Sequence, residues 1–129
     1  PILDLDNFFT DIHKYLRYLE EIIIKTLLDF GIKSTRGDGE TGVWLDLDTP
    51  FARKICAMGV RASRWVTMHG FALNINTDLS YFDYIVPCGI KGKKVTSLSK
   101  ELNKQVDPEL VKASLLKNFS EIFEVEIIN

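Results

Sequence analysis

The sequence has little of what marks several large classes of protein. Its 129 residues contain only two cysteines, Cys56 and Cys88, which argues against a disulfide scaffold and predicts a reducing, cytoplasmic compartment. No run of about 18 apolar residues and no hydrophobic segment of a secretory signal occur, so we expect neither a membrane span nor export. The net charge of −2 provides no basic excess for binding nucleic acid. The two histidines, His13 and His69, do not have the spacing of metal ligands, and we expect no metal site.

The remaining composition is that of one globular domain. Hydrophobic residues make up 46% of the chain and charged residues 26%, with no repeat and no low-complexity tract. Three glycines fall between Ser34 and Gly42, but no helix start follows them. We interpret this stretch as a flexible loop and not as a phosphate-binding loop, and we expect neither a nucleotide nor any other cofactor.

Apolar residues at steps of three and four predict two main helices. The first covers residues 7–30, with Asp6 capping its start and Gly31 its end. Its run from Glu20 to Lys25 is apolar nearly all round, so we expect other elements to cover more than one side of this helix. The second begins at Asp107-Pro108-Glu109, an aspartate cap followed by a proline in the first turn. Its predicted core face consists of Leu110, Val111, Leu115, Phe119, Ile122 and Phe123, and shorter helices are predicted over residues 79–84 and up to residue 102.

The centre of the chain predicts a sheet. Val43 to Leu47 is interpreted as a strand with Trp44 and Leu45 on opposite faces. Residues 54–63 and 66–76 are two alternating runs separated by only two residues, which favours an antiparallel hairpin.

Glycines interrupt both strands of this hairpin. Because glycine weakens a strand, Gly59 and Gly70 indicate a bulge or a place where a ligand approaches the backbone. His69 alternates onto the same face as Phe71 and Leu73, so we interpret it as a hydrogen-bonded core histidine rather than as a general base.

Cys88 is the candidate nucleophile, because it lies between Pro87 and Gly89 in a non-repetitive backbone that favours an exposed thiol. A nucleophilic cysteine needs a nearby cation or base that favours the thiolate. Lys54 is our candidate for that cation, while three lysines closer in sequence remain alternatives, and a buried structural cysteine is the competing interpretation. These three lysines are Lys91, Lys93 and Lys94. They belong to a basic turn that is either only solvated or attracts an acidic carrier protein.

Five motifs stand between Gly42 and Leu102. They are Lys-Ile-Cys-Ala-Met-Gly at 54–59, Thr-Met-His-Gly-Phe-Ala-Leu-Asn at 67–74, Asp-Leu at 78–79, Pro-Cys-Gly at 87–89 and Thr-Ser-Leu at 96–98. Together they resemble the C-terminal half of the octanoyltransferases of the lipoate-protein ligase B family. The resemblance implies an α/β (α+β) fold of the biotin and lipoate ligase type, with a mixed or antiparallel sheet flanked by helices.

The resemblance also implies the site. Cys88 would carry the acyl group as a thioester, and Lys54 would lower the pKa of its thiol and shuttle protons. Contacts to the acyl chain and its carbonyl are implied for Ala57, Met58, Gly59, Gly70, Phe71 and Ala72, with His69 in the pocket wall. The implied reaction moves an octanoyl group from acyl carrier protein to Cys88. The octanoyl group is then transferred from Cys88 to a lysine on lipoyl domains of 2-oxoacid dehydrogenases or on the glycine cleavage H protein.

The resemblance is partial. Members of the family carry Arg-Gly-Gly and His-Gly-Pro-Gly-Gln segments that line the other side of the acyl tunnel, and neither occurs here. We expect residues 1–129 to be the C-terminal portion of a single ligase-like acyltransferase domain, with the missing half as a further partner. Two alternatives stay open: a noncatalytic subunit of the same fold, and a cysteine-dependent thioester hydrolase that uses Cys88 with His69.

Overall fold

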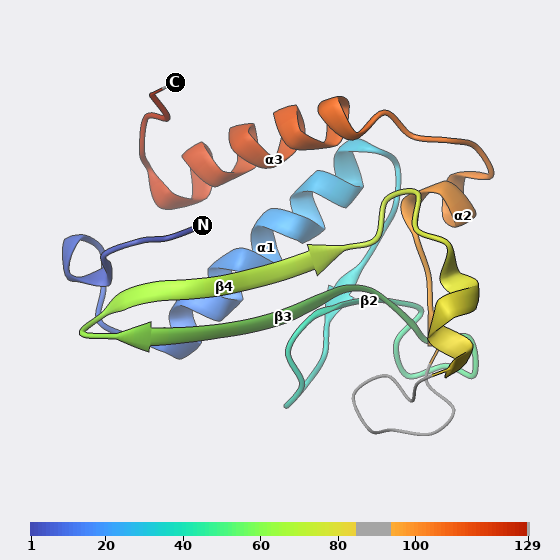
Figure 1. The fold of residues 1–129 in the computed structure, drawn as a ribbon, viewed down its shortest axis with the longest axis horizontal. Helices are drawn as coiled ribbons and strands as arrows, with labels where there is room; N and C mark the ends of the chain where they lie inside the picture. The colour runs from blue at the N-terminus through green and yellow to red at the C-terminus, as the bar shows by residue number, and fades with distance from the viewer. Residues whose placement is uncertain (85–93, 129) are drawn as a thin grey trace.

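The computed structural model describes residues 1–84 and 94–128, and the predicted nucleophile Cys88 lies outside them. Its strands form one sheet in the order β1-β2-β3-β4, antiparallel throughout, and β5 pairs with β3 in parallel (Figure 1). The helices are η1 (Leu5–Asn7), α1 (Ile12–Asp29), η2 (Leu79–Tyr84), α2 (Leu98–Leu102) and α3 (Pro108–Phe123). The strands are β1 (Thr35–Arg36), β2 (Val43–Leu45), β3 (Arg53–Ser63), β4 (Val66–Leu73) and β5 (Lys94–Val95).

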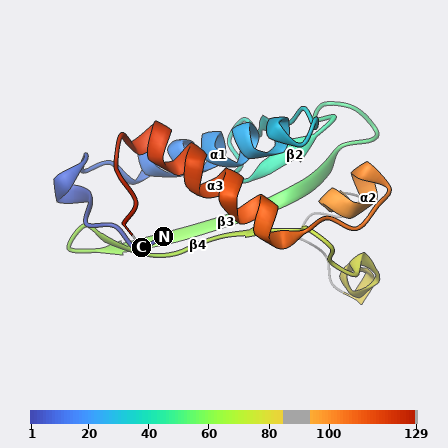
Figure 2. The same cartoon turned by 90° about the horizontal axis from the view of Figure 1, so that it is seen from above.

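Helices α1 and α3 lie side by side over one face of the sheet (Figure 2). The core between these layers holds Leu19, Ile23 and Leu27 from α1 and Val111 and Phe123 from α3. It continues into the sheet through apolar side chains of β2 and β3. The α+β fold predicted from the sequence is confirmed, as is the covering of α1 on more than one side.

Helix α1 begins later than predicted. Asp11, not Asp6, is its N-cap, and its side chain accepts a hydrogen bond from Lys14 N at 3.1 Å. The residues before it form the separate turn η1, so the apolar steps continue across two elements. The predicted end is correct: Gly31 has φ +82°, and the chain closes with a hydrogen bond from Ile32 N to Leu27 O of 2.9 Å.

Helix α3 has the predicted cap but not the whole predicted core face. Asp107 accepts a hydrogen bond from Glu109 N at 3.0 Å, and Pro108 is the first helical residue. Leu110, however, is 60% exposed, so its assignment to the core was wrong. The polar Asn118 is buried instead and donates hydrogen bonds to Thr26 Oγ1 and Asp29 Oδ2 on α1, both 3.1 Å long. A hydrophobic pattern alone does not reveal such a polar contact between two helices.

Two predictions around β2 were also wrong. The stretch from Ser34 to Gly42 is not entirely a loop, since Thr35–Arg36 form β1 against β2. Strand β2 ends at Leu45, two residues before the predicted end at Leu47, and because all three of its residues are buried, the opposite faces predicted for Trp44 and Leu45 are both covered. Gly37 lies against the Trp44 ring, where a Cβ would be 3.3 Å from Nε1, so the chain between the two strands helps to cover this side chain.

The β3–β4 hairpin is confirmed. Its two turn residues, Arg64 and Trp65, have φ of 51° and 66°, and a two-residue turn with positive φ at both positions matches the twist of paired strands. The register places Gly59 opposite Gly70. Strand β4 ends at Leu73, three residues earlier than predicted, because Asn74 Nδ2 donates to Thr96 O and ties the chain to the segment after β5.

Candidate active site

Lys54 is buried at the start of β3, with only 9% of its surface exposed. Its backbone pairs with Trp44 of β2 on one side and with Val95 of β5 on the other. The Nζ lies 4.8 Å from the centroid of the Trp44 ring, within cation–π range. Most lysines are solvated surface charges, so a lysine held in this way by two strands and an indole ring is the first sign of a functional site.

Gly42 forms the other wall of this lysine slot. A Cβ at this position would be 3.3 Å from Lys54 Cε and 2.8 Å from the backbone oxygen of Cys56, and φ is +117°. Both conditions require glycine. Gly42 N donates a 3.1 Å hydrogen bond to the fully buried carboxylate of Glu20 on α1, which fixes the wall to the helix layer.

The structure distinguishes Lys54 from one of the alternative cations. Lys94 is exposed in β5 and pairs through its backbone with Arg53, whereas Lys91 and Lys93 lie outside the described residues with Cys88. Strand β5 therefore brings the chain beside Arg53 and Lys54 only six residues after Cys88 in sequence.

An open groove of about 710 Å³ lies along the hairpin. All seven residues for which the resemblance implies substrate contacts line it, together with Pro1. The seven are Ala57, Met58, Gly59, His69, Gly70, Phe71 and Ala72. The structure thus brings these positions together on one surface, and their role in binding stays a prediction.

Small residues form the floor of this groove. Ala57 pairs with Ala72 across the two strands, and Gly59 pairs with Gly70. Met58 lies between Ala57 and Gly59 on β3 and packs against the core. By alternation, Ala57 and Gly59 therefore face away from the helices. Nothing lies within 4 Å of a Cβ built on Gly59. At Ala57 and Gly59 the floor is therefore free of large side chains, a surface on which an extended aliphatic chain can lie against the backbone.

Alternation predicted that His69 lies in the core, and this prediction is wrong. It is exposed, with φ of +66°, and Gly70 after it has φ of +155°. These left-handed residues break the regular pleat, so the imidazole leaves the face occupied by Phe71 and Leu73. Its place in the groove wall fits the implied pocket role better than the core role.

Comparison with known proteins identifies the family at this point. The model of the lipoyl protein ligase A/B catalytic domain matches residues 1–120. The chain belongs to this family.

Similar proteins agree with this ligase-family assignment. The chain is 71% identical over 98% of its length to an octanoyltransferase of Christiangramia forsetii, and 67% identical over 99% of its length to one of Flavobacterium johnsoniae. It covers 55% and 56% of those proteins, so it spans about half the length of the relatives it matches.

Solved structures support the fold of this ligase-family domain. The apo biotin protein ligase of Aquifex aeolicus has a TM-score of 0.71 at 18% identity, over 95% of this chain and 50% of that one. A bipartite lipoate protein ligase of Thermoplasma acidophilum has a TM-score of 0.72 at 18% identity, over 93% of this chain and 49% of that one. At this identity the likeness shows the biotin and lipoate ligase fold.

Cys56 is a free thiol in the core of the ligase-family domain. Burial raises the pKa of this thiol to about 12, although the charge of Lys54 acts in the opposite direction. At neutral pH it is therefore a protonated, inaccessible side chain, as predicted for a strand cysteine.

Alkylation should distinguish the two cysteines. We expect an alkylating reagent near neutral pH to modify Cys88 first and Cys56 only when the protein unfolds, because reaction requires an accessible thiolate. Peptide mapping over a pH series measures both rates, and labelling in denaturant provides the control in which both react. Equal labelling of the folded protein, or faster labelling of Cys56, would contradict the assignment of Cys88 as nucleophile.

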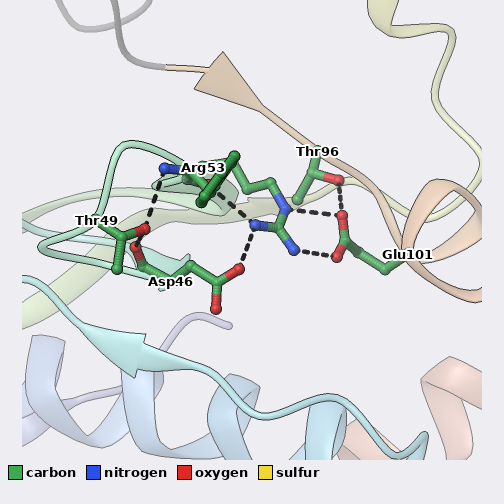
Figure 3. Close-up of polar contacts among 6 residues, drawn as sticks. Asp46, Thr49, Arg53, Thr96 and Glu101 are labelled. Carbon is green, nitrogen blue, oxygen red and sulfur yellow. Dashed lines mark hydrogen bonds and ion pairs between the residues drawn. The ribbon is translucent and has the colours of Figure 1, made fainter.

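A polar network next to Lys54 was not predicted from the sequence (Figure 3). Arg53 donates from Nε to Glu101 Oε2 at 2.9 Å and from Nη1 to Asp46 Oδ2 at 2.7 Å. Arg53 Nη2 donates to Glu101 Oε1, so the pair is bidentate, and Thr96 Oγ1 donates to the same carboxylate at 2.6 Å. Glu101 is 48 residues from Arg53 in sequence, so no local pattern could have indicated the pair.

The charges in this network reinforce one another. The hydrogen bond from Arg53 holds the pKa of Glu101 below its ordinary value of 4.5, against the effect of partial burial. The hydrogen bond to Glu101 raises the pKa of Arg53 in turn. Because the carboxyl pKa is depressed, the stabilisation from this pair is present at neutral pH. It is lost as the pH falls through the folded pKa of Glu101, below 4.5.

Residues 1–84 and 94–128 contain no group of three or more histidine, cysteine or acidic side chains that could hold a metal ion. Within the same residues, no helix combines the length and the hydrophobicity that crossing a bilayer requires.

Proposed function

We propose that this chain carries the cysteine and lysine of an octanoyl-[acyl-carrier-protein]–protein N-octanoyltransferase. The observation that supports this most is the buried Lys54 at the start of β3, the strand whose residues 57–59 line an open groove with a small-residue floor. Identity of 65–71% to octanoyltransferases over nearly the whole chain supports the same substrate class. The proposal places the chain in the cytoplasm, as the C-terminal portion of one acyltransferase domain.

The reaction has two steps. The thiolate of Cys88 attacks the octanoyl thioester of acyl carrier protein, a new thioester forms, and the carrier thiol leaves with a proton. The ε-amine of a lysine on a lipoyl domain then attacks this thioester, an amide forms, and the Cys88 thiol is released. The acceptor is a lipoyl domain of a 2-oxoacid dehydrogenase or the glycine cleavage H protein. The acyl-enzyme conserves the energy of the donor thioester, so no nucleotide is needed.

Lys54 has two tasks in this mechanism. Its positive charge favours the thiolate of Cys88, and its amine passes protons between the thiol, the leaving group and the attacking amine. The slot between Gly42 and Trp44 restricts the lysine side chain to few conformations. Placing the reacting group in this way replaces orientation that free solution would have to provide.

The groove would hold the octanoyl chain along Ala57, Gly59, Gly70 and Ala72. Each methylene removed from water contributes about 0.8 kcal/mol. The groove is open on one side, and the relatives are about twice as long as this chain. We propose that their other half supplies the second wall and that this chain alone transfers octanoyl groups poorly.

Co-expression tests the proposed function. This chain is produced alone and together with the half of a relative that carries the Arg-Gly-Gly and His-Gly-Pro-Gly-Gln segments. Mass spectrometry then measures octanoylation of a lipoyl domain supplied with octanoyl-acyl carrier protein. We expect a modified lysine with the pair and little with the chain alone. Free octanoate without modified lipoyl domain would favour the thioester hydrolase, and no reaction with the pair would favour a noncatalytic subunit.

Filling the groove at Gly59 should weaken the use of the acyl donor. Gly59→Leu places a side chain where nothing lies within 4 Å, so the fold is retained while the floor is blocked. Obstructing two methylenes costs about 1.6 kcal/mol, which is roughly a fifteenfold rise in KM for octanoyl-acyl carrier protein.

Ser63→Leu is the matched control for this variant. Ser63 is exposed on the same strand face but lies at the hairpin turn, outside the groove lining. An unchanged KM in Gly59→Leu, or an equal rise in Ser63→Leu, would show that the acyl chain does not lie on this floor.

A further inference from the structure

Arg53 joins two segments beside Lys54, the connection between β2 and β3 and helix α2. Its guanidinium contacts Asp46 in the connection after β2, Glu101 on α2 and the backbone oxygen of Phe51, the last at 3.0 Å. Figure 3 shows the side chain extended between the two carboxylates. Arginine is the one side chain whose planar fork can bind one carboxylate bidentately and reach a second at the same time.

The same contacts hold the backbone of Lys54. Thr96 N donates to Lys54 O at 2.9 Å, and the Thr96 hydroxyl donates to Glu101, the partner of Arg53. On the other side, Asp46 follows β2 directly, and β2 pairs with Arg53 and Lys54 through Leu45 and Trp44. The strand at Lys54 is therefore fixed from both edges by groups that meet at one guanidinium.

We propose that Arg53 and Glu101 are positioning residues for Lys54 in acyl transfer, an inference that rests on the proposed function. Successive side chains of a strand point to opposite faces, so Arg53 acts on Lys54 through the backbone and not within its slot. The network connects β2, β5 and α2 at the strand end that carries the buried lysine. A displacement of about 1 Å in a reacting group can reduce turnover by about 100-fold, which explains why this strand end would need such support.

Accessibility of the Lys54 amine tests the proposal independently of activity. Glu101→Gln keeps the shape and an acceptor for Thr96 but removes the charge, and Arg53→Lys keeps the charge but not the fork. Folded protein is treated with an amine-acylating reagent, and peptide mapping measures the rate at Lys54. We expect labelling about tenfold faster in both variants. The exposed Lys112 should react at an unchanged rate.

Two controls separate positioning from general destabilisation. Alkylation of the fully buried Cys56 reports global opening and should stay slow in both variants. Glu21→Gln removes the acidic partner of Arg36, another arginine–glutamate pair, and should leave Lys54 labelling unchanged. Unchanged Lys54 labelling in the Glu101 and Arg53 variants would overturn the proposal. A parallel rise at Cys56, or the same rise in Glu21→Gln, would also overturn it.

Steady-state kinetics of octanoyl transfer complete the test. The variants are compared under the conditions in which the unmodified protein transfers octanoyl groups. We expect kcat to fall by about 10- to 100-fold in Glu101→Gln, with KM for octanoyl-acyl carrier protein changed less than about twofold. A rise in KM at constant kcat would contradict positioning of Lys54. If the unmodified protein shows no transfer at all, the proposed function fails, while the labelling result still decides whether this network orders Lys54.

Discussion

Octanoyl transfer should fall by at least about 100-fold when Lys54 is replaced by arginine, although the positive charge is retained. A guanidinium does not give up its proton near neutral pH, so it can favour the thiolate but cannot shuttle protons. Lys54→Met should lose transfer as well and should also slow the alkylation of Cys88, because the charge is gone. The measurement is turnover with octanoyl-acyl carrier protein and a lipoyl domain, beside the alkylation rate of Cys88.

Lys94→Arg is the control for this prediction. Lys94 is exposed in the neighbouring strand and is one of the alternative cations. Its replacement should leave turnover unchanged. Normal turnover in Lys54→Arg, or a larger loss in Lys94→Arg, would show that the proton-transfer role was assigned to the wrong lysine.

Gly42→Ala should lower the free energy of unfolding by about 2–5 kcal/mol. The new Cβ would lie 2.8 Å from the Cys56 carbonyl oxygen, and neither this backbone nor the positive φ of +117° can adapt without moving β3. Because the same Cβ meets Lys54 Cε, transfer should fall together with stability. Chemical denaturation measures the first effect and octanoylation of a lipoyl domain the second.

Gly39→Ala separates the two causes of this loss. Gly39 also has a positive φ, +75°, but nothing lies within 4 Å of its built Cβ. We expect it to cost only the backbone strain, about 1–2 kcal/mol. If Gly42→Ala were no less stable than Gly39→Ala, the close packing of Gly42 against Cys56 and Lys54 would be wrong.

Local chemistry made much of the fold predictable. The two-residue connection at Arg64 and Trp65 indicated the hairpin, and Asp107 with Pro108 indicated the start of α3. Gly59 and Gly70 predicted a bulge or a place where a ligand approaches the backbone, and in the structure they lie opposite each other in the lining of the groove. These features depend on residues within a few positions of one another or on a simple repeat.

Features that depend on contacts distant in sequence could not be predicted. The burial of Lys54 requires Trp44 of β2 and Gly42 directly before it, and the network of Arg53 requires Glu101 on α2, 48 residues further along the chain. The prediction from alternation failed at His69 because alternation assumes a regular pleat, and the left-handed backbone at this residue interrupts it. Cys88, the proposed nucleophile, was predicted from its neighbours in sequence and from the resemblance alone.

Intact-mass analysis after incubation with octanoyl-acyl carrier protein tests the central claim most directly. Three forms are assayed, each in the presence of the other half of a full-length relative: the unmodified protein, Cys88→Ser and Cys56→Ala. We predict one octanoyl group per chain, removable by hydroxylamine as a thioester, mapped to Cys88 and passed on when a lipoyl domain is added. The adduct should persist in Cys56→Ala and disappear in Cys88→Ser. An adduct that survives in Cys88→Ser, or no adduct in any form of the folded protein, would contradict octanoyl transfer through Cys88.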